Sequence, residues 1–191
     1  MLIAQEKEKS NIAEYIIYMW QIEDIIRSHN FDLAQINDSV ISKFNAPTEV
    51  QYDMKLWYQN LIEQMMKEGI SDKGHLSITF KYMEELNNLH NSLLTTIQDA
   101  KYQEAYLAAK DHLNNFMLKA GGESRNEIHT CLIGLYGLLL LKLKRTEISS
   151  ATKDAMASFS MLLAVLVDRY NKIKKGELSF PKEKFQPHFG F

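Results

Sequence analysis

The chain has 191 residues, of which 46% are hydrophobic and 24% are charged, and its formal net charge is −2. These values are typical of a single globular domain with its own hydrophobic core, and they exclude a disordered or low-complexity chain. The single cysteine, Cys131, excludes an intrachain disulfide and fits a reducing compartment.

Two features predict a soluble cytoplasmic protein without a membrane-spanning segment. Polar residues occupy positions 5–9, where a signal peptide would have its apolar core. The longest apolar run, residues 131–141, falls short of the roughly 20 residues that span a bilayer.

Basic residues outnumber acidic ones only after residue 130, which predicts attraction between the two parts of the chain. The alternative is a basic face at 169–184 for an anionic partner, but no motif indicates nucleic acid.

The first half of the chain predicts four helices. Apolar residues recur every three to four positions, prolines are rare, and no segment alternates with period two. Asp32 and Thr48 are suited to begin helices, and Gly69 is suited to end one. The predicted helices cover residues 11–28, with an earlier start left open, then 32–44, 48–68 and about 75–97.

The second half predicts three more helices, at residues 101–119, at 124–143 and from Ser149 or Ser150 to Lys175. Ser124 and Glu127 have the spacing of a capping box for the second of these. The last two helices are apolar almost all round, so we expect them to form a central hairpin covered by the others. The expected fold class is all-α, with a single bundle of six to seven helices over residues 1–176.

Residues 177–191 are predicted to form an extended tail. Pro181 and Pro187 oppose helix formation. Phenylalanines at 180, 185, 189 and 191 carry more apolar surface than a free tail would leave in water. We therefore expect the tail to dock on its own bundle; the alternative is that it binds a second chain.

Motifs of several enzyme classes are absent from the sequence. There is no glycine-rich phosphate loop, no GxSxG elbow, no HExxH and no Glu-x-x-His pattern. No cofactor or metal is predicted, although a metal site assembled from histidines on separate helices stays open. Cys131 lies in the most apolar helix, which indicates an inert buried thiol rather than a nucleophile.

Three polar side chains fall on apolar helix faces. Glu23 lies within the apolar stripe of the first helix, and His90 and His129 lie on apolar sides of later helices. Burying a carboxylate costs several kcal/mol unless it is paired, so Glu23 should have a partner. Arg27, one turn along, is the nearest; His90, His129 and a tyrosine hydroxyl are others. Three interpretations are open. These residues belong to a structural network that fixes helix register, they are exposed at a helix end, or they build a ligand or catalytic site.

Aromatic residues suggest how such a ligand site would be built. Tyr15 and Trp20 lie on the first helix beside Glu23, and Trp57 lies on the third. Core packing of the first and third helices is the simpler explanation of these aromatics, and a ligand pocket is the alternative. A ligand site would combine these aromatics with the charged and polar candidates. The full set of candidate site residues is Glu23, Arg27, His90, His129, Tyr15, Trp20 and Trp57.

The N-terminus resembles that of an uncharacterised family. The resemblance lies in Met1–Lys7, Asn11–Tyr15 and Tyr18–Asp24, and a further likeness extends to Asp168–Tyr170. The family is a domain of unknown function found mainly in Bacteroidetes, with members of about this length. The resemblance implies a cytoplasmic all-α protein and brings no activity, cofactor or site residue with it.

Two functions are compatible with these patterns. The first is a non-enzymatic helical bundle that acts through protein contacts, as a homo-oligomer. The alternative is a bundle that binds a small molecule or a metal, or an enzyme, with Glu23, His90 and His129 converging on one cavity.

Overall fold

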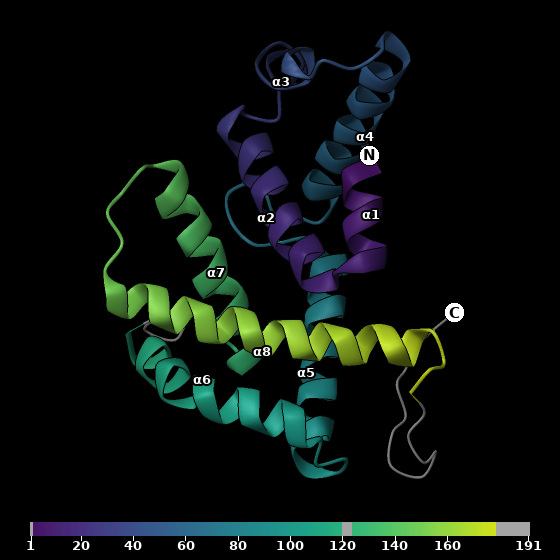
Figure 1. The fold of residues 1–191 in the computed structure, drawn as a ribbon. Coiled ribbons are helices and arrows are strands. Elements are labelled where there is room, and N and C mark those ends of the chain that lie inside the picture. Colours follow the sequence, from purple (N-terminus) through teal and green to yellow (C-terminus); the bar gives the residue numbers. More distant parts are fainter. Residues whose placement is uncertain (1, 120–123, 179–191) are drawn as a thin grey trace. The chain divides into compact units, whose positions relative to one another are not determined.

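The computed structural model describes residues 2–119 and 124–178, and all regular elements within these ranges are helices (Figure 1). The all-α prediction is therefore confirmed. The elements are α1 (Leu2–Ser10), α2 (Ile12–Ser28), α3 (Leu33–Ser39), a 3-10 turn η1 (Ile41–Lys43), α4 (Thr48–Lys67), α5 (Ser77–Thr95), α6 (Ala100–Lys119), α7 (Glu127–Leu143) and α8 (Ser150–Lys174). The predicted tail at 179–191 lies outside the described residues.

The described part of the chain contains eight α-helices, more than the six to seven predicted, because the first segment is divided. Asn11 has an extended backbone, and its side chain accepts a hydrogen bond from the Glu14 N–H. An asparagine in this conformation caps a new helix instead of continuing the previous one. The sequence analysis left open whether the first helix starts before residue 11. The residues before Asn11 instead form a separate helix, α1.

Most predicted helix boundaries hold because local capping groups fix them. The Asp32 carboxylate accepts N–H bonds from Ala34 and Gln35, and the Ser149 hydroxyl accepts one from Thr152. The predicted capping box at α7 is wrong. Asn126 caps this helix through the His129 N–H, while the Ser124 hydroxyl donates to the Asn126 carbonyl.

The chain divides into two compact units, which we call the N-terminal unit (1–81) and the C-terminal unit (82–191). Within the N-terminal unit, α1 packs along α2, and both α3 and η1 pack against α4. Within the C-terminal unit, α6 packs extensively against α8, and α7 contacts both.

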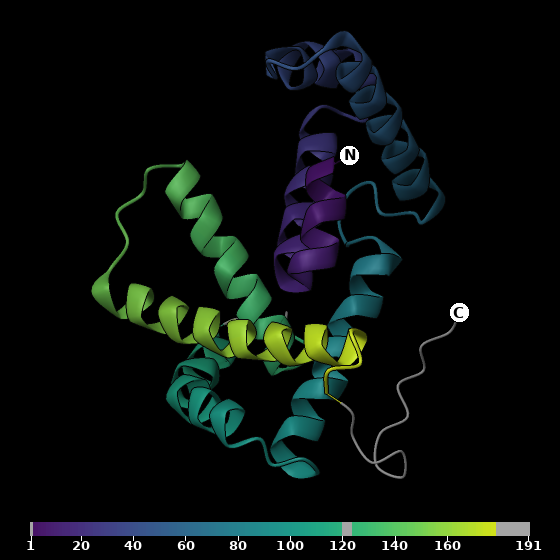
Figure 2. The same ribbon diagram turned by 45° about the vertical axis from the view of Figure 1, so that its right-hand side comes forward.

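The central hairpin predicted for the last two helices is not formed as expected. α7 is buried from Ile128 to Leu132 and at Gly134, but from Leu135 to Leu143 it is half-buried or exposed. Its N-terminal end lies against α8, and the two helices diverge toward the C-terminal end of α7 (Figures 1 and 2). The part of the chain that the structure describes therefore does not cover α7 on every side.

The two glycines of α7 show where the helices separate. A Cβ on Gly134 would lie 3.1 Å from the side chains of Met156 and Phe159 on α8, whereas a Cβ on Gly137 would meet nothing within 4 Å. Gly134 therefore permits close contact with α8. Gly137 has no such role within the described chain, although glycine costs about 1 kcal/mol of helix propensity relative to alanine.

α8 is long and apolar enough, by length and composition alone, to cross a membrane. The core helix of a soluble protein passes the same test. One face of α8 is buried, with Phe159, Leu162 and Leu166 fully inaccessible to solvent. This buried face supplies part of the apolar content of α8, while Met161 is 60% exposed.

Candidate functional site

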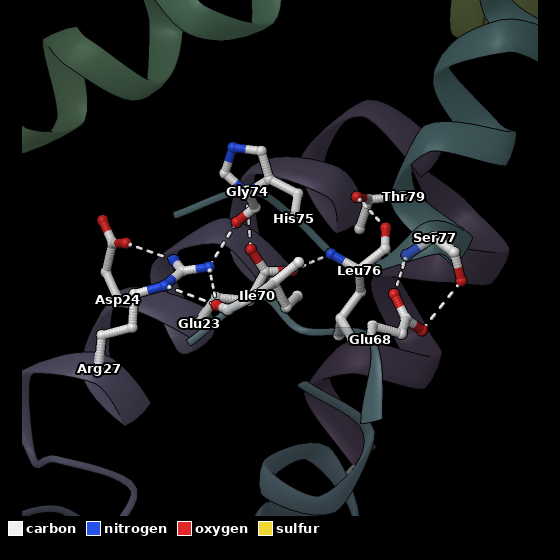
Figure 3. A network of polar contacts seen from close by, with 10 residues as sticks. All are labelled: Glu23, Asp24, Arg27, Glu68, Ile70, Gly74, His75, Leu76, Ser77 and Thr79. Atoms are coloured by element: carbon white, nitrogen blue, oxygen red, sulfur yellow. Dashed lines mark hydrogen bonds and ion pairs between the residues drawn. The ribbon is translucent and has the colours of Figure 1, made fainter. Parts of the chain in front are cut away.

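Glu23 is fully buried and binds a loop that is distant in sequence (Figure 3). One carboxylate oxygen lies 2.6 Å from His75 Nδ1, and the other accepts the Leu76 N–H at 3.0 Å. Both partners lie at the entrance to α5. The expectation that Glu23 is buried with a partner is met, but that partner is His75, which the candidate residues did not include.

A second carboxylate completes the start of α5. Glu68 accepts the Ser77 N–H at 2.7 Å and the Ser77 hydroxyl at 3.0 Å (Figure 3). The first N–H groups of a helix lack partners within the helix, and its positive dipole end favours anions. Glu23 and Glu68 therefore cap the preceding segment and the first turn of α5 from two other elements.

Arg27 belongs to the same network but has other partners. Its guanidinium donates to the carbonyls of Ile70, at 3.2 Å, and Gly74, and it pairs with Asp24 at 3.0 Å. The Gly74 backbone has φ of 99°, a conformation that favours glycine. Arg27 thus fixes the loop between α4 and α5, where it satisfies backbone carbonyls.

The aromatic candidates of α2 surround this network. The Trp20 ring stacks on His75, with centroids 4.4 Å apart and 22° between the planes. Burial raises the pKa of Tyr15 to about 12, with smaller contributions from the charges of Glu8 and Glu23. Trp20 and Tyr15 are 1% and 8% exposed. Their role is consistent with core packing, the alternative that the sequence left open.

His90 lies in a separate network within the C-terminal unit. Its Nδ1 is 2.7 Å from the Tyr102 hydroxyl, and its Nε2 is 2.8 Å from Glu127. Tyr106 donates to the other Glu127 oxygen at 2.9 Å. These contacts join α5, α6 and the first turn of α7. The partners come from three helices, and sequence spacing alone gave no signal that would bring them together.

Glu127 makes the stability of this network dependent on pH. The His90 hydrogen bond lowers the pKa of Glu127 below its usual 4.5, against the opposing effect of burial and with help from Tyr106. A carboxyl with a depressed folded-state pKa stabilises the fold above its unfolded pKa, and this contribution is lost as the pH falls through the folded value. We expect Glu127→Gln to reduce the loss of stability below about pH 4.5. Urea denaturation at pH 3 and pH 7 measures this, and an unchanged difference between the two would contradict it.

His129 has local partners at the start of α7. Its Nδ1 accepts the Arg125 N–H at 3.1 Å, and its own N–H is bound by Asn126. Glu23, His90 and His129 are thus each held by different groups. Among the described residues, no cluster of three or more His, Cys, Asp or Glu side chains could hold a metal ion.

Cys131 is fully buried in α7, and burial raises the pKa of its thiol. The thiolate is the reactive form, so a buried thiol of raised pKa should be inert in the folded protein. We expect no reaction with Ellman's reagent at pH 8 under native conditions, and one thiol per chain in 6 M guanidinium. Fast reaction of the native protein would show that α7 opens readily or that the site is accessible.

The centre of each polar network is buried, while the side chains of His75 and Glu127 at its edge remain 26% and 27% exposed. Glu23 and Tyr102 are 0% exposed and His90 is 2% exposed. A general acid or base must come within hydrogen-bond distance of a substrate. The geometry therefore suits these residues to joining helices, and buried polar groups that are hydrogen-bonded in this way specify how elements pair.

A groove in the N-terminal unit is the other candidate site. Its volume is about 500 Å³, and it lies between α1, α4 and the segment between η1 and α4. It is lined by Leu2, Ile3, Gln5, Phe44, Ala46, Val50, Asp53, Met54, Leu56, Trp57 and Asn60. Of the predicted site residues, Trp57 lines this groove, and Glu23, Tyr15 and Trp20 are not among the residues that line it.

The chain belongs to the family described as a domain of unknown function (DUF4924), whose model matches residues 1–177. The resemblance of the N-terminus to an uncharacterised family is therefore confirmed. No curated protein and no solved structure matches the chain.

Proposed function

We propose that this family member is a non-enzymatic, cytoplasmic helical protein that acts through protein contacts, and that it self-associates through the second half of α7. The observation that carries the proposal is the incomplete cover of residues 135–143. This segment is almost entirely apolar, yet it is half-buried or exposed throughout, with Leu141 at 36% and Leu143 at 61%.

The composition of this segment suits the centre of a protein interface. Its only charged residue is Lys142, which is exposed. Contiguous apolar surface on a soluble protein marks an interaction site, and the cores of interfaces are depleted of charge. A second copy of the chain is a self-complementary partner, because a two-fold interface uses the same patch on both subunits.

Gly137 supports the same surface independently of the leucines. It lies within the uncovered segment, and a Cβ there would meet no described atom of its own chain within 4 Å. A glycine on a helix surface permits a second helix axis to come close. Contact between copies would thus give Gly137 the packing role that Gly134 has against α8.

The buried networks favour a structural role over the alternative of an enzyme or metal protein. Glu23 and His75 join α2 to the start of α5, and His90, Tyr102 and Glu127 join three helices. Each of these contacts connects two elements of the fold. We therefore assign the function to an exposed surface, the second half of α7, and not to the buried networks.

Sedimentation velocity over a wide concentration range tests the proposal. We expect the native chain to associate reversibly and the double variant Leu141→Gln/Leu143→Gln to stay monomeric. Both leucines are exposed, so folding should be little affected. The matched control is Leu118→Gln on α6, which removes a leucine that is 82% exposed. A native chain that is monomeric at high concentration, or equal association of all three proteins, would contradict the proposal.

A further inference from the structure

We propose that the groove of the N-terminal unit, between α1 and α4, binds a small organic cation with an apolar body, such as an arylalkylammonium. This inference is independent of self-association through α7. It rests on the shape of the groove, its apolar walls and a carboxylate that has no partner among residues 2–119 and 124–178.

The walls and size of the groove suit a small molecule. A volume of about 500 Å³ lies within the range of roughly 300–1,000 Å³ that is typical of ligand sites. Leu2, Ile3 and Leu56 line it and remain 74%, 40% and 42% exposed. A bound apolar group would therefore remove surface from water that the fold itself leaves uncovered.

The polar groups of the groove point to a cation. Asp53 is exposed and forms no ion pair or hydrogen bond with any described residue. It is also the only charged residue among those that line the groove in the described part of the chain. An anionic ligand would meet repulsion from this carboxylate, whereas a cation would be attracted.

Two aromatic side chains strengthen this preference. Trp57 lies one helical turn after Asp53 on α4, and Phe44 lines the groove from the preceding segment. Aromatic faces attract ammonium groups, and tryptophan does so most strongly. A carboxylate and two aromatic rings around one groove thus favour an ammonium head, while Val50 and Met54 provide an apolar wall for the body.

A matched series of three compounds tests the inference. 4-Phenylbutylammonium, 4-phenylbutanol and 4-phenylbutyrate share one apolar body and differ in charge. Each is titrated into the full chain, and binding is followed by the indole N–H signals in a ¹H–¹⁵N spectrum. The chain has two tryptophans. Trp57 lines the groove and should shift, whereas Trp20 is 1% exposed beneath His75 and should not.

We expect saturable binding with roughly fivefold to tenfold preference for the cation over the alcohol, and the weakest binding for the anion. Asp53→Asn should abolish the preference for the cation while leaving the alcohol affinity within about twofold. Glu63→Gln is the control, because Glu63 is a carboxylate of α4 that does not line the groove.

Three outcomes would overturn the inference. The first is a Trp57 signal that does not shift, or shifts without saturation. The second is equal binding of cation and alcohol by the native chain, which would mark a patch without charge selectivity. The third is an Asp53→Asn protein, folded by its spectrum, that keeps the full preference for the cation.

Discussion

Replacing Glu23 with alanine is expected to lower the free energy of unfolding by about 3–5 kcal/mol, the range for removal of one partner from a buried pair. The carboxylate is fully buried, and it holds both His75 and the Leu76 N–H. Without it, a buried N–H at the start of α5 has lost its acceptor, and the loop between α4 and α5 is no longer tied to α2. Urea denaturation followed by circular dichroism measures the change.

Asp24 provides the matched control, because it is the adjacent carboxylate on the same helix. Its side chain is 49% exposed and pairs with Arg27 at 3.0 Å. Exposed pairs are worth about 0–1 kcal/mol, so Asp24→Ala should have a small effect. If Glu23→Ala melts at the same temperature as the native chain, the buried network does not hold the N-terminal unit together.

His90→Ala is expected to cost about 2–4 kcal/mol in the stability of the C-terminal unit. The substitution leaves a cavity, and it removes the partner of the Tyr102 hydroxyl, which is fully buried. Glu127 loses its contact with α5 in the same step. Equilibrium denaturation of the variant measures the loss.

His112 is the control for this second prediction. It is a half-buried histidine of α6 whose Nδ1 lies 2.9 Å from the Ser158 hydroxyl. Because its surroundings include solvent, His112→Ala should cost clearly less than His90→Ala. Equal effects of the two substitutions would show that burial of His90 in its network adds nothing to stability.

The helices were predictable because their signals are local. Asp32 and Ser149 cap the helices that follow them, and Gly69 and Gly176 follow helix ends with positive φ. A capping side chain binds N–H groups two or three residues away, so sequence contains the whole interaction. The missed division between α1 and α2 also has a local cause, because Asn11 could either continue a helix or begin one.

The sites were only partly predictable, because their partners are remote. Glu23 was recognised as buried from its place on an apolar stripe, but His75 is 52 residues away and reaches it through a loop. Helical spacing favoured Arg27, which instead binds the carbonyls of that loop. The available signal for the partner of Glu23 was the position of His75, which follows Gly74 and lies just before the start of a helix.

The exposure of α7 was the largest departure from expectation. An apolar helix was assumed to be covered by its own chain, but burial depends on the path of the backbone after Gly134. Periodicity reports which residues are apolar and does not report which molecule covers them. The same leucines that predicted a central hairpin now support a contact between copies.

An intermolecular distance measurement tests self-association through α7 most directly. Lys142→Cys places one reactive thiol on the exposed face of α7, while the native Cys131 is 0% exposed and should stay unlabelled. Double electron–electron resonance between spin labels at position 142 should then give a defined distance between two copies, and Leu141→Gln/Leu143→Gln in the same protein should abolish it. A signal without any defined intermolecular distance at high protein concentration would contradict the account.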